Sequence, residues 1–237
     1  MGRRKESGIL KDYLIAVTIA VVVALLIRFF LIEAYRIPSH AMRPALESGD
    51  TIFVLKSAYN VRMPFSAEPL IRIAPPSRGD VVVFATPTDP DYDYIKRIVA
   101  LPGDTVQVRN GHVILNGKPL SADPLSSNPC GMQTLPAGPT HLICWEPPSV
   151  ADFGPTKVPE QSVFVIGDMR SDIRAASSTS LGLSSADSAK FRSWGIIPIV
   201  SLKGKALWVW LSVEPGSASR GSWFPQIRFE RMLRRIQ

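Results

Sequence analysis

The sequence predicts a mainly β protein, with a single N-terminal transmembrane helix followed by an antiparallel β-sheet domain. Three observations predict it. Residues 13–32 are predominantly apolar, and Arg28 is the one charged residue among them. After them, short runs rich in Val, Ile, Phe and Trp are separated by Gly, Pro, Asn and Asp, as is typical of strands and turns. No long stretch shows helical periodicity before Phe229–Ile236.

The apolar run is long enough to cross a bilayer. At ~1.5 Å rise per residue, a helix over 13–32 is about 30 Å long, the thickness of the hydrocarbon core. Arg28 lies near its end, where a long side chain can snorkel to the headgroups. A cleaved signal peptide would have a shorter apolar run and small residues after it, whereas Glu33–Arg36 follow here. We therefore expect a retained anchor.

Basic residues ahead of the run predict its orientation. The positive-inside rule places residues 1–12 in the cytoplasm and residues 33–237 outside. The residues that set this orientation are Arg3, Arg4, Lys5 and Lys11.

The whole chain is basic, with a net charge of +7 and a pI near 9.6. Its basic residues gather towards the two ends, and neither zinc-finger spacing nor an RNA-binding signature accompanies them. We therefore expect no nucleic-acid partner. For a tethered protein, attraction to the anionic headgroups of the lipid bilayer is the better interpretation.

Seven runs after the anchor are expected to form strands. Asn110-Gly111 predicts a type I′ hairpin turn between two of them, and Asn116-Gly117 a second tight turn. The expected strands are 51–56, 80–85, 94–101, 105–108, 112–115, 162–166 and 206–211.

Two stretches interrupt the strand pattern. Residues 121–156 are rich in Pro and Gly and are expected to form an inserted lobe. Residues 171–193, rich in Ser and Ala, are either a flexible loop or a short helix near 186–191. In an oxidising compartment Cys130 and Cys144 can pair, which would contribute ~3 kcal/mol on the chain-entropy model. The alternative is two unrelated buried thiols.

The aromatic residues near the C-terminal end allow two interpretations. Trp208 and Trp210, in the 206–211 run, either dip into the membrane surface or belong to a buried core strand. Trp223, Phe224 and the basic tail are expected to rest on lipid headgroups.

The histidines do not predict a metal site. His40, His112 and His141 have no partner at metal-ligand spacing, so we expect neither a metal nor another cofactor. A Ser/His/Asp triad would need one of these imidazoles, and the sequence alone leaves His40 open for that role.

Lys96 is the more informative candidate. Period-2 alternation puts Tyr94, Lys96 and Ile98 on one face of a strand. If that face is internal, loss of hydration lowers the pKa of Lys96 and makes it available as a general base. The alternative places Lys96 and Arg97 at a solvated edge, and this stretch alone favours the alternative.

A series of motifs in a fixed order reverses that preference. They are 37–46 (IPSHAMRPAL), 78–84 (RGDVVVF), 94–104 (YIKRIVALPGD), 164–170 (FVIGDMR) and Trp194-Gly195. In order and rough spacing they resemble the motifs of bacterial type I signal peptidase, from the anchor nearly to the C-terminus. RGDVVVF and YIKRIVALPGD are the most specific of them.

The resemblance implies a membrane-bound serine endopeptidase that removes signal peptides from exported preproteins. It would be a single-pass protein of the bacterial inner membrane with its C-terminal domain in the periplasm, and it would use a Ser/Lys dyad. Lys96 matches the general base, and Ser39 matches a serine of the oxyanion hole. Met42, Tyr94 and Ile95 would bind substrate.

The nucleophile position departs from the family. The pattern there is Ser-x-Ser-Met, and its second serine is replaced by Ala41, which has no nucleophilic atom. Either the chain is an engineered knock-out, or it is a natural pseudoenzyme that binds preproteins or envelope partners without cleavage. A third interpretation makes Ser39 or His40 a displaced nucleophile or base. A dedicated pilus- or conjugation-type peptidase is a further alternative.

The last motif departs as well. Met169 replaces an Asn of the family, and extra residues precede Trp-Gly. One register places Ser188 at the serine that supports the lysine, and Lys190 at an aspartate position. The other keeps Ser and Asp but puts Ala189 at the arginine position. Both registers stay open, and this drift favours the natural pseudoenzyme.

Overall fold

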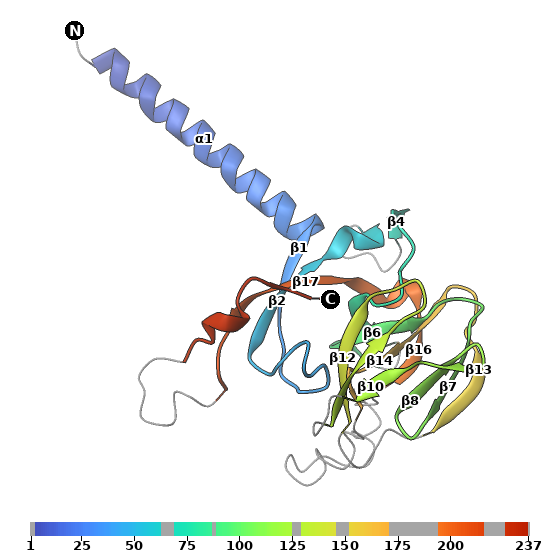
Figure 1. Cartoon of the computed structure of the whole chain (residues 1–237). Helices are drawn as coiled ribbons and strands as arrows, with labels where there is room; N and C mark the ends of the chain where they lie inside the picture. Colours follow the sequence, from blue (N-terminus) through green and yellow to red (C-terminus); the bar gives the residue numbers. More distant parts are fainter. Residues whose placement is uncertain are drawn as a thin grey trace.

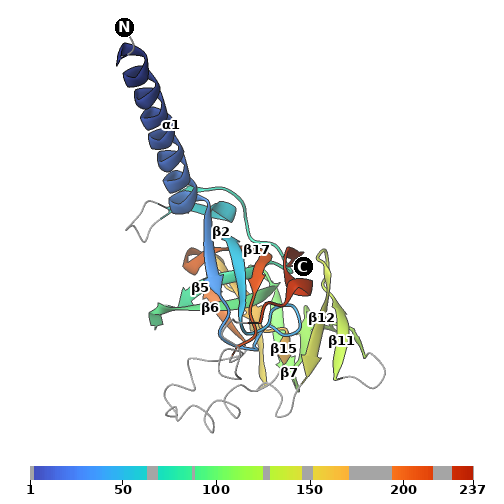
Figure 2. The ribbon, with the colours of Figure 1, turned by 90° about the vertical axis from the view of Figure 1, so that its left-hand side faces the viewer.

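A computed structural model describes residues 3–62, 69–86, 89–124, 129–145, 152–170, 194–215 and 226–236. One long helix stands off a β-rich body (Figure 1), and a view from the side shows the same separation (Figure 2). The described strands pair antiparallel apart from the parallel pair β12 and β15, so the predicted, mainly antiparallel β fold class is confirmed.

The helix α1 (Arg3–Phe30) has the properties of a membrane anchor. Its segment Lys11–Phe30 has a mean hydropathy of 2.6 and is not buried against the protein. Within the described ranges it is the single helix that is long and apolar enough to cross a membrane. It ends at Phe30, short of the predicted residue 32, because Ile32 already pairs with Leu55 in the first strand.

The largest sheet has eight strands, in the order β1-β2-β17-β5-β6-β14-β16 with β18 paired to β17. Its neighbouring strands are antiparallel throughout. The bounds are β1 (Ile32–Arg36), β2 (Asp50–Leu55), β5 (Val81–Thr86), β6 (Asp89–Ala100), β14 (Ser162–Ile166), β16 (Trp194–Pro198), β17 (Leu202–Ser212) and β18 (Arg234–Arg235).

Three smaller sheets complete the described body. The first has the order β13-β7-β8-β9, the second β10-β11-β12-β15, and the third pairs β3 with β4. The bounds are β3 (Asn60–Arg62), β4 (Pro69–Arg72), β7 (Thr105–Arg109), β8 (His112–Leu115), β9 (Lys118–Pro119), β10 (Ala122–Pro124), β11 (Cys130–Thr134), β12 (Thr140–Trp145), β13 (Phe153–Lys157) and β15 (Met169–Arg170). Three short 3-10 turns lie at Lys56–Ala58 (η1), Ile199–Ser201 (η3) and Phe229–Arg231 (η5).

Strand β5 shows why the RGDVVVF motif is so apolar. Val81 and Val83 pack into one core cluster, whereas Val82 and Phe84 pack into a second cluster. Both faces of the strand are therefore buried, and a continuous apolar run is required where a one-sided strand would alternate.

The predicted tight turns are confirmed. Asn110 and Gly111 have φ of 48° and 77°, and Asn116 and Gly117 have φ of 52° and 77°. Positive φ at both central residues is the type I′ geometry, which joins β7 to β8 and β8 to β9.

The stretch 121–156 contributes to two different sheets. Strands β10, β11 and β12 form one sheet with β15, while β13 pairs with β7. Cys130 faces Cys144 across β11 and β12, and the two are joined by a disulfide, so the predicted pairing is confirmed.

The helical periodicity of residues 229–236 does not produce a helix. The chain instead forms the turn η5 and the short strand β18. Leu233 has φ of 58°, which a helix does not allow, and the amide of Ile236 donates to the carbonyl of Leu207. Phe229 is 73% and Leu233 82% exposed, so an apolar helical face would have had nothing to pack against.

Trp208 and Trp210 lie on the outer face of β17. Trp208 is 46% exposed, and Trp210 stacks on Phe53 at 5.5 Å between ring centroids. The buried-core alternative for these two residues is therefore wrong. Ser188, the 171–193 stretch, Trp223 and Phe224 lie outside the described residues.

Candidate active site

The loop 37–49 joins β1 to β2 and carries Ser39 and Ala41. The hairpin ladder continues into its base, where the amide of Ile37 donates to the carbonyl of Asp50 at 2.8 Å and that of Gly49 to Ile37 at 2.9 Å. Gly49 has φ of 90°, and a Cβ there would lie 1.9 Å from the carbonyl oxygen of Val213. The loop therefore leaves and returns at one end of the hairpin, and only glycine fits where it closes.

Two apolar side chains fix the loop to the core. Met42 and Leu46 are buried in the cluster that contains Val81 and Val83, and the amide of Leu46 donates to the carbonyl of Met42 at 2.8 Å. This packing leaves Ala41 buried, Ser39 half-buried and His40 exposed. In the described part of the chain no carboxylate pairs with His40, which leaves the imidazole without the partner that a triad needs.

Lys96 is buried, as the internal-face alternative predicts. It lies on β6, between β5 and β14, and only 5% of it is exposed. Burial lowers its pKa to about 8, against the opposing effect of the Asp168 charge. Tyr94 and Ile98 pack in one cluster on the same face of the strand. A neutral amine is therefore accessible near physiological pH.

Gly167 brings Lys96 and residue 41 together. A Cβ on Gly167 would lie 3.4 Å from Lys96 Nζ and 2.5 Å from the carbonyl oxygen of Ala41. The amide of Met169 donates to that same carbonyl at 3.2 Å. The Gly-Asp-Met-Arg motif therefore holds the backbone of residue 41 next to the lysine amine.

The residue after Lys96 faces the other side of the sheet. Arg97 is fully buried and donates from Nε and Nη2 to the two carboxylate oxygens of Asp168, at 2.8 and 2.6 Å. Its Nη1 donates to the carbonyl of Gly79 at 2.9 Å. The solvated-edge alternative is therefore wrong for both Lys96 and Arg97. The ion pair fixes the turn 167–169 against β6.

Arg170 holds the same turn in place from strand β15, which belongs to the sheet β10-β11-β12-β15. It is buried, and its guanidinium donates to the carbonyls of Gly167 and Gly111 and to the side-chain oxygen of Gln133. Burial lowers its pKa to about 10, so it stays charged at neutral pH. The sequence pattern indicated the arginine but gave no signal for Gln133.

His141, to which the sequence assigned no role, is buried. Its Nε2 lies 3.9 Å from Asp168 Oδ1, and within the described structure neither ring nitrogen makes a hydrogen bond. Burial is the largest cause that lowers the pKa of His141, to about 4, and the charge of Arg97 is the second. His141 is therefore neutral at physiological pH.

The expected substrate-binding residues lie on both sides of the lysine. Tyr94 is half-buried; its ring stacks on that of Phe84, at 5.8 Å between centroids, and makes a tilted contact with that of Tyr92, at 5.3 Å. Ile95 is half-buried against the cluster in which Met42 is fully buried. Among the described residues no three His, Cys, Asp or Glu side chains are grouped as a metal site.

The comparisons with known proteins agree with this geometry. A family model for signal peptidase, peptidase S26, matches residues 10–211. Signal peptidase I of Pseudomonas fluorescens is 33% identical over 209 residues, and that of Pseudomonas aeruginosa 34%; each alignment covers 80% of this chain and 68% of the relative. Signal peptidase I of Bacillus licheniformis is 36% identical over 165 residues, 70% of this chain and 76% of the relative. The region matched by the family model includes residues 10–30 of α1, the loop 37–49, Lys96 and the motif 167–170. The chain therefore belongs to the signal peptidase family, peptidase S26.

Proposed function

We propose that this chain is a membrane-anchored signal peptidase I whose site is complete except for the nucleophile. The family supports a serine endopeptidase that acts on preproteins with signal peptides. The observation that carries the proposal is the buried Lys96, whose pKa is lowered to about 8 and whose amine lies beside the backbone of residue 41. Such a base has no use without a nucleophile, and Ala41 provides none.

A serine at position 41 would complete the reaction. Lys96 would take the hydroxyl proton as the serine oxygen attacks the scissile carbonyl, and the Ser39 hydroxyl would face the oxyanion. The peptide bond then breaks, the proton passes to the leaving amine, and water hydrolyses the acyl-enzyme. The preprotein would bind as an extended segment, paired by its main chain with a strand edge, with small side chains in shallow pockets.

The anchor gives this site its place. We assign residues 1–12 to the cytoplasm and residues 33–237 to the periplasmic side of the bacterial inner membrane. The loop 37–49 follows α1 after one short strand, so the site would lie close to the outer surface of the bilayer. A membrane-inserted signal peptide emerges at that level, and tethering both partners to one bilayer raises their effective concentration.

The natural pseudoenzyme is the second candidate. The departure of the last motif favours it, because Met169 stands where the family has Asn and extra residues precede Trp-Gly. The codon at position 41 of the natural gene separates the two, since a serine codon selects the peptidase and an alanine codon the pseudoenzyme. A dedicated pilus- or conjugation-type peptidase would instead cleave a single partner in a panel of preproteins.

The decisive variant is Ala41→Ser. Reconstituted in proteoliposomes with a preprotein, the parent chain should cleave nothing, and Ala41→Ser should release the mature protein. Adding Lys96→Ala should abolish that cleavage, whereas adding Lys118→Ala, which removes an exposed lysine on β9, should leave it intact. An Ala41→Ser chain that stays inactive would reject the peptidase assignment and leave the pseudoenzyme.

A further inference from the structure

A buried carboxylate lies at the base of the loop 37–49. Asp50 is 0% exposed and accepts hydrogen bonds from the amide of Glu47, at 2.9 Å, and from Ser212 Oγ, at 2.7 Å. Arg231 donates to both carboxylate oxygens, from Nε at 3.1 Å and from Nη2 at 2.6 Å. Burial alone would raise the pKa of Asp50, but these hydrogen bonds, led by that from Arg231, hold its pKa below the usual value.

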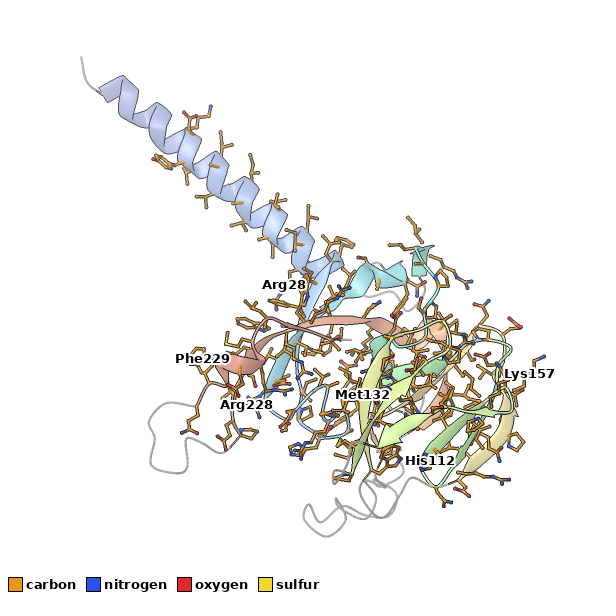
Figure 3. All side chains as sticks on the ribbon, viewed as in Figure 1. Arg28, His112, Met132, Lys157, Arg228 and Phe229 are labelled. Carbon is orange, nitrogen blue, oxygen red and sulfur yellow. A yellow bond between two sulfur atoms is a disulfide. The ribbon has the colours of Figure 1, made fainter. Side chains whose placement is uncertain are left out.

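The same arginines also hold the backbone of the loop. Arg228 Nη2 donates to the carbonyl of Ser48 at 2.8 Å, and Arg231 Nη2 contacts the carbonyl of Ala45 at 3.4 Å. Arg228 also forms an ion pair with Glu47, at 3.5 Å between Nη1 and Oε2. Both arginines belong to the segment 226–236, which pairs with β17 through β18; Arg228 is labelled in Figure 3. The segment 226–236 therefore contacts the part of the loop that follows Ala41, at residues 45–48.

The segment 226–236 contributes little to the core. Ile227, Phe229 and Leu233 are exposed, and the segment is fastened to the body chiefly by main-chain hydrogen bonds, such as Arg228 to Ser212 and Ile236 to Leu207. Of its apolar side chains, Ile236 packs against the core cluster that contains Met42 and Leu46. Its two arginines are directed inward as well, towards Asp50 and the loop, and a role in holding the loop explains why these charged side chains are buried there.

We propose that Arg228 and Arg231 are positioning residues, which act through Asp50 to hold position 41 against Lys96. We call the segment 226–236 the C-terminal clamp. It fixes the second half of the loop, while Met169 and Gly167 fix the backbone at Ala41. The part of the proposal that concerns catalysis rests on the proposed function. The part that concerns the position of the loop is independent of it. Displacing a nucleophile by about 1 Å can cost up to about a hundredfold in rate, so such a clamp matters.

The first test measures the loop directly, in the full chain with Ala41 in place. Hydrogen exchange in detergent micelles or nanodiscs should compare the parent with the double variant Arg228→Gln/Arg231→Gln. Amides within the loop, such as those of Leu46 and Glu47, are hydrogen-bonded in the parent. In the double variant we expect them to exchange at least roughly tenfold faster, because Asp50 loses its counter-charges and draws in water.

Two variants act as controls. Arg78→Gln breaks a comparable ion pair with Asp104, at 2.6 and 2.8 Å, which lies outside the loop, and it should leave loop exchange unchanged. Arg228→Lys/Arg231→Lys keeps the positive charges but loses the planar guanidinium groups. Its loop amides should therefore exchange at rates between those of the parent and those of the glutamine double variant. If the glutamine pair does not fold, Arg231→Lys alone should still speed exchange at Glu47.

The second test uses the Ala41→Ser background. The glutamine pair should lower kcat roughly tenfold or more and change KM less than about twofold, because Tyr94 and Ile95 are untouched. The lysine pair should recover part of the loss, and Arg78→Gln should lose stability but not kcat. If the two arginines had only a structural role, the substitutions would lower the amount of folded enzyme, but kcat per folded enzyme and KM would both stay unchanged.

The outcomes separate the two proposals. Loop exchange equal to that of the parent, or exchange that rises equally over all strands, would overturn the clamp. An inactive Ala41→Ser chain would overturn the peptidase function, yet the exchange measurement would still decide whether the clamp exists.

Discussion

Lys96 shows what a single residue gains from its surroundings. The alternation of the YIKRIV stretch places it on one face, but this stretch alone favours a solvated edge. In the fold, β6 lies between β5 and β14, which come from distant parts of the chain, and both faces of β6 are covered. Burial of Lys96 thus depends on the order of the strands in the sheet, which the local sequence does not encode. The expectation that Lys96 is buried came instead from the resemblance of the motif series to the family.

Gly167 permits a test at the same scale. Adding a Cβ at this position puts it 2.5 Å from the carbonyl of Ala41, a backbone atom that must then move. In the Ala41→Ser background, Gly167→Ala should therefore lower kcat/KM by about a hundredfold, through displacement of the nucleophile. The measurement is cleavage of a preprotein by the two purified enzymes.

Gly195→Ala is the matched control, because a Cβ there meets no atom of the described residues within 4 Å. It should retain the activity of Ala41→Ser. Equal activity in the two glycine variants would mean that the contact between the turn 167–169 and residue 41 does not position the nucleophile.

At the scale of elements, the apolar runs predicted the strands well and the tail poorly. Runs such as 51–56 and 162–166 form β2 and β14, because their Val, Ile and Phe pack into the core. Strands β10 to β13 were missed because the Pro- and Gly-rich 121–156 stretch lacks that apolar pattern, and its strands depend on pairing with β15 and β7. The helical periodicity of residues 229–236 did not correspond to a helix, because periodicity cannot show whether the protein offers a surface against which an apolar helical face could pack.

The disulfide allows a prediction for the sheet that contains β11 and β12. Cys130→Ser/Cys144→Ser should lower the free energy of unfolding by ~3 kcal/mol, because the open chain regains the freedom of the closed loop. Urea denaturation followed by fluorescence measures the change. A reductant should destabilise the parent by a similar amount and leave the variant unchanged; a variant as stable as the oxidised parent would contradict the prediction.

At the scale of the whole molecule, the chain ties its site to a membrane and to its own C-terminal end. The anchor leads through β1 into the loop with Ser39 and Ala41, and the clamp returns from residues 226–236 to the same loop. The sequence predicted the apolar helix, and the resemblance to the family is the basis on which we propose the site residues. The sequence did not indicate the clamp, because Asp50 and Arg231 lie far apart in sequence and their pairing follows from sheet topology.

The central claim is that Lys96 is the general base of a site that lacks only its nucleophile. The most direct measurement is the pH dependence of kcat/KM for Ala41→Ser, with a substrate that has no titrating group near the cleavage site. Only the neutral amine accepts the serine proton, so kcat/KM should rise with pH and level off above an apparent pKa of about 8. A midpoint near the ordinary histidine value of about 6.5, or near the ordinary lysine value of about 10.4, would contradict the account.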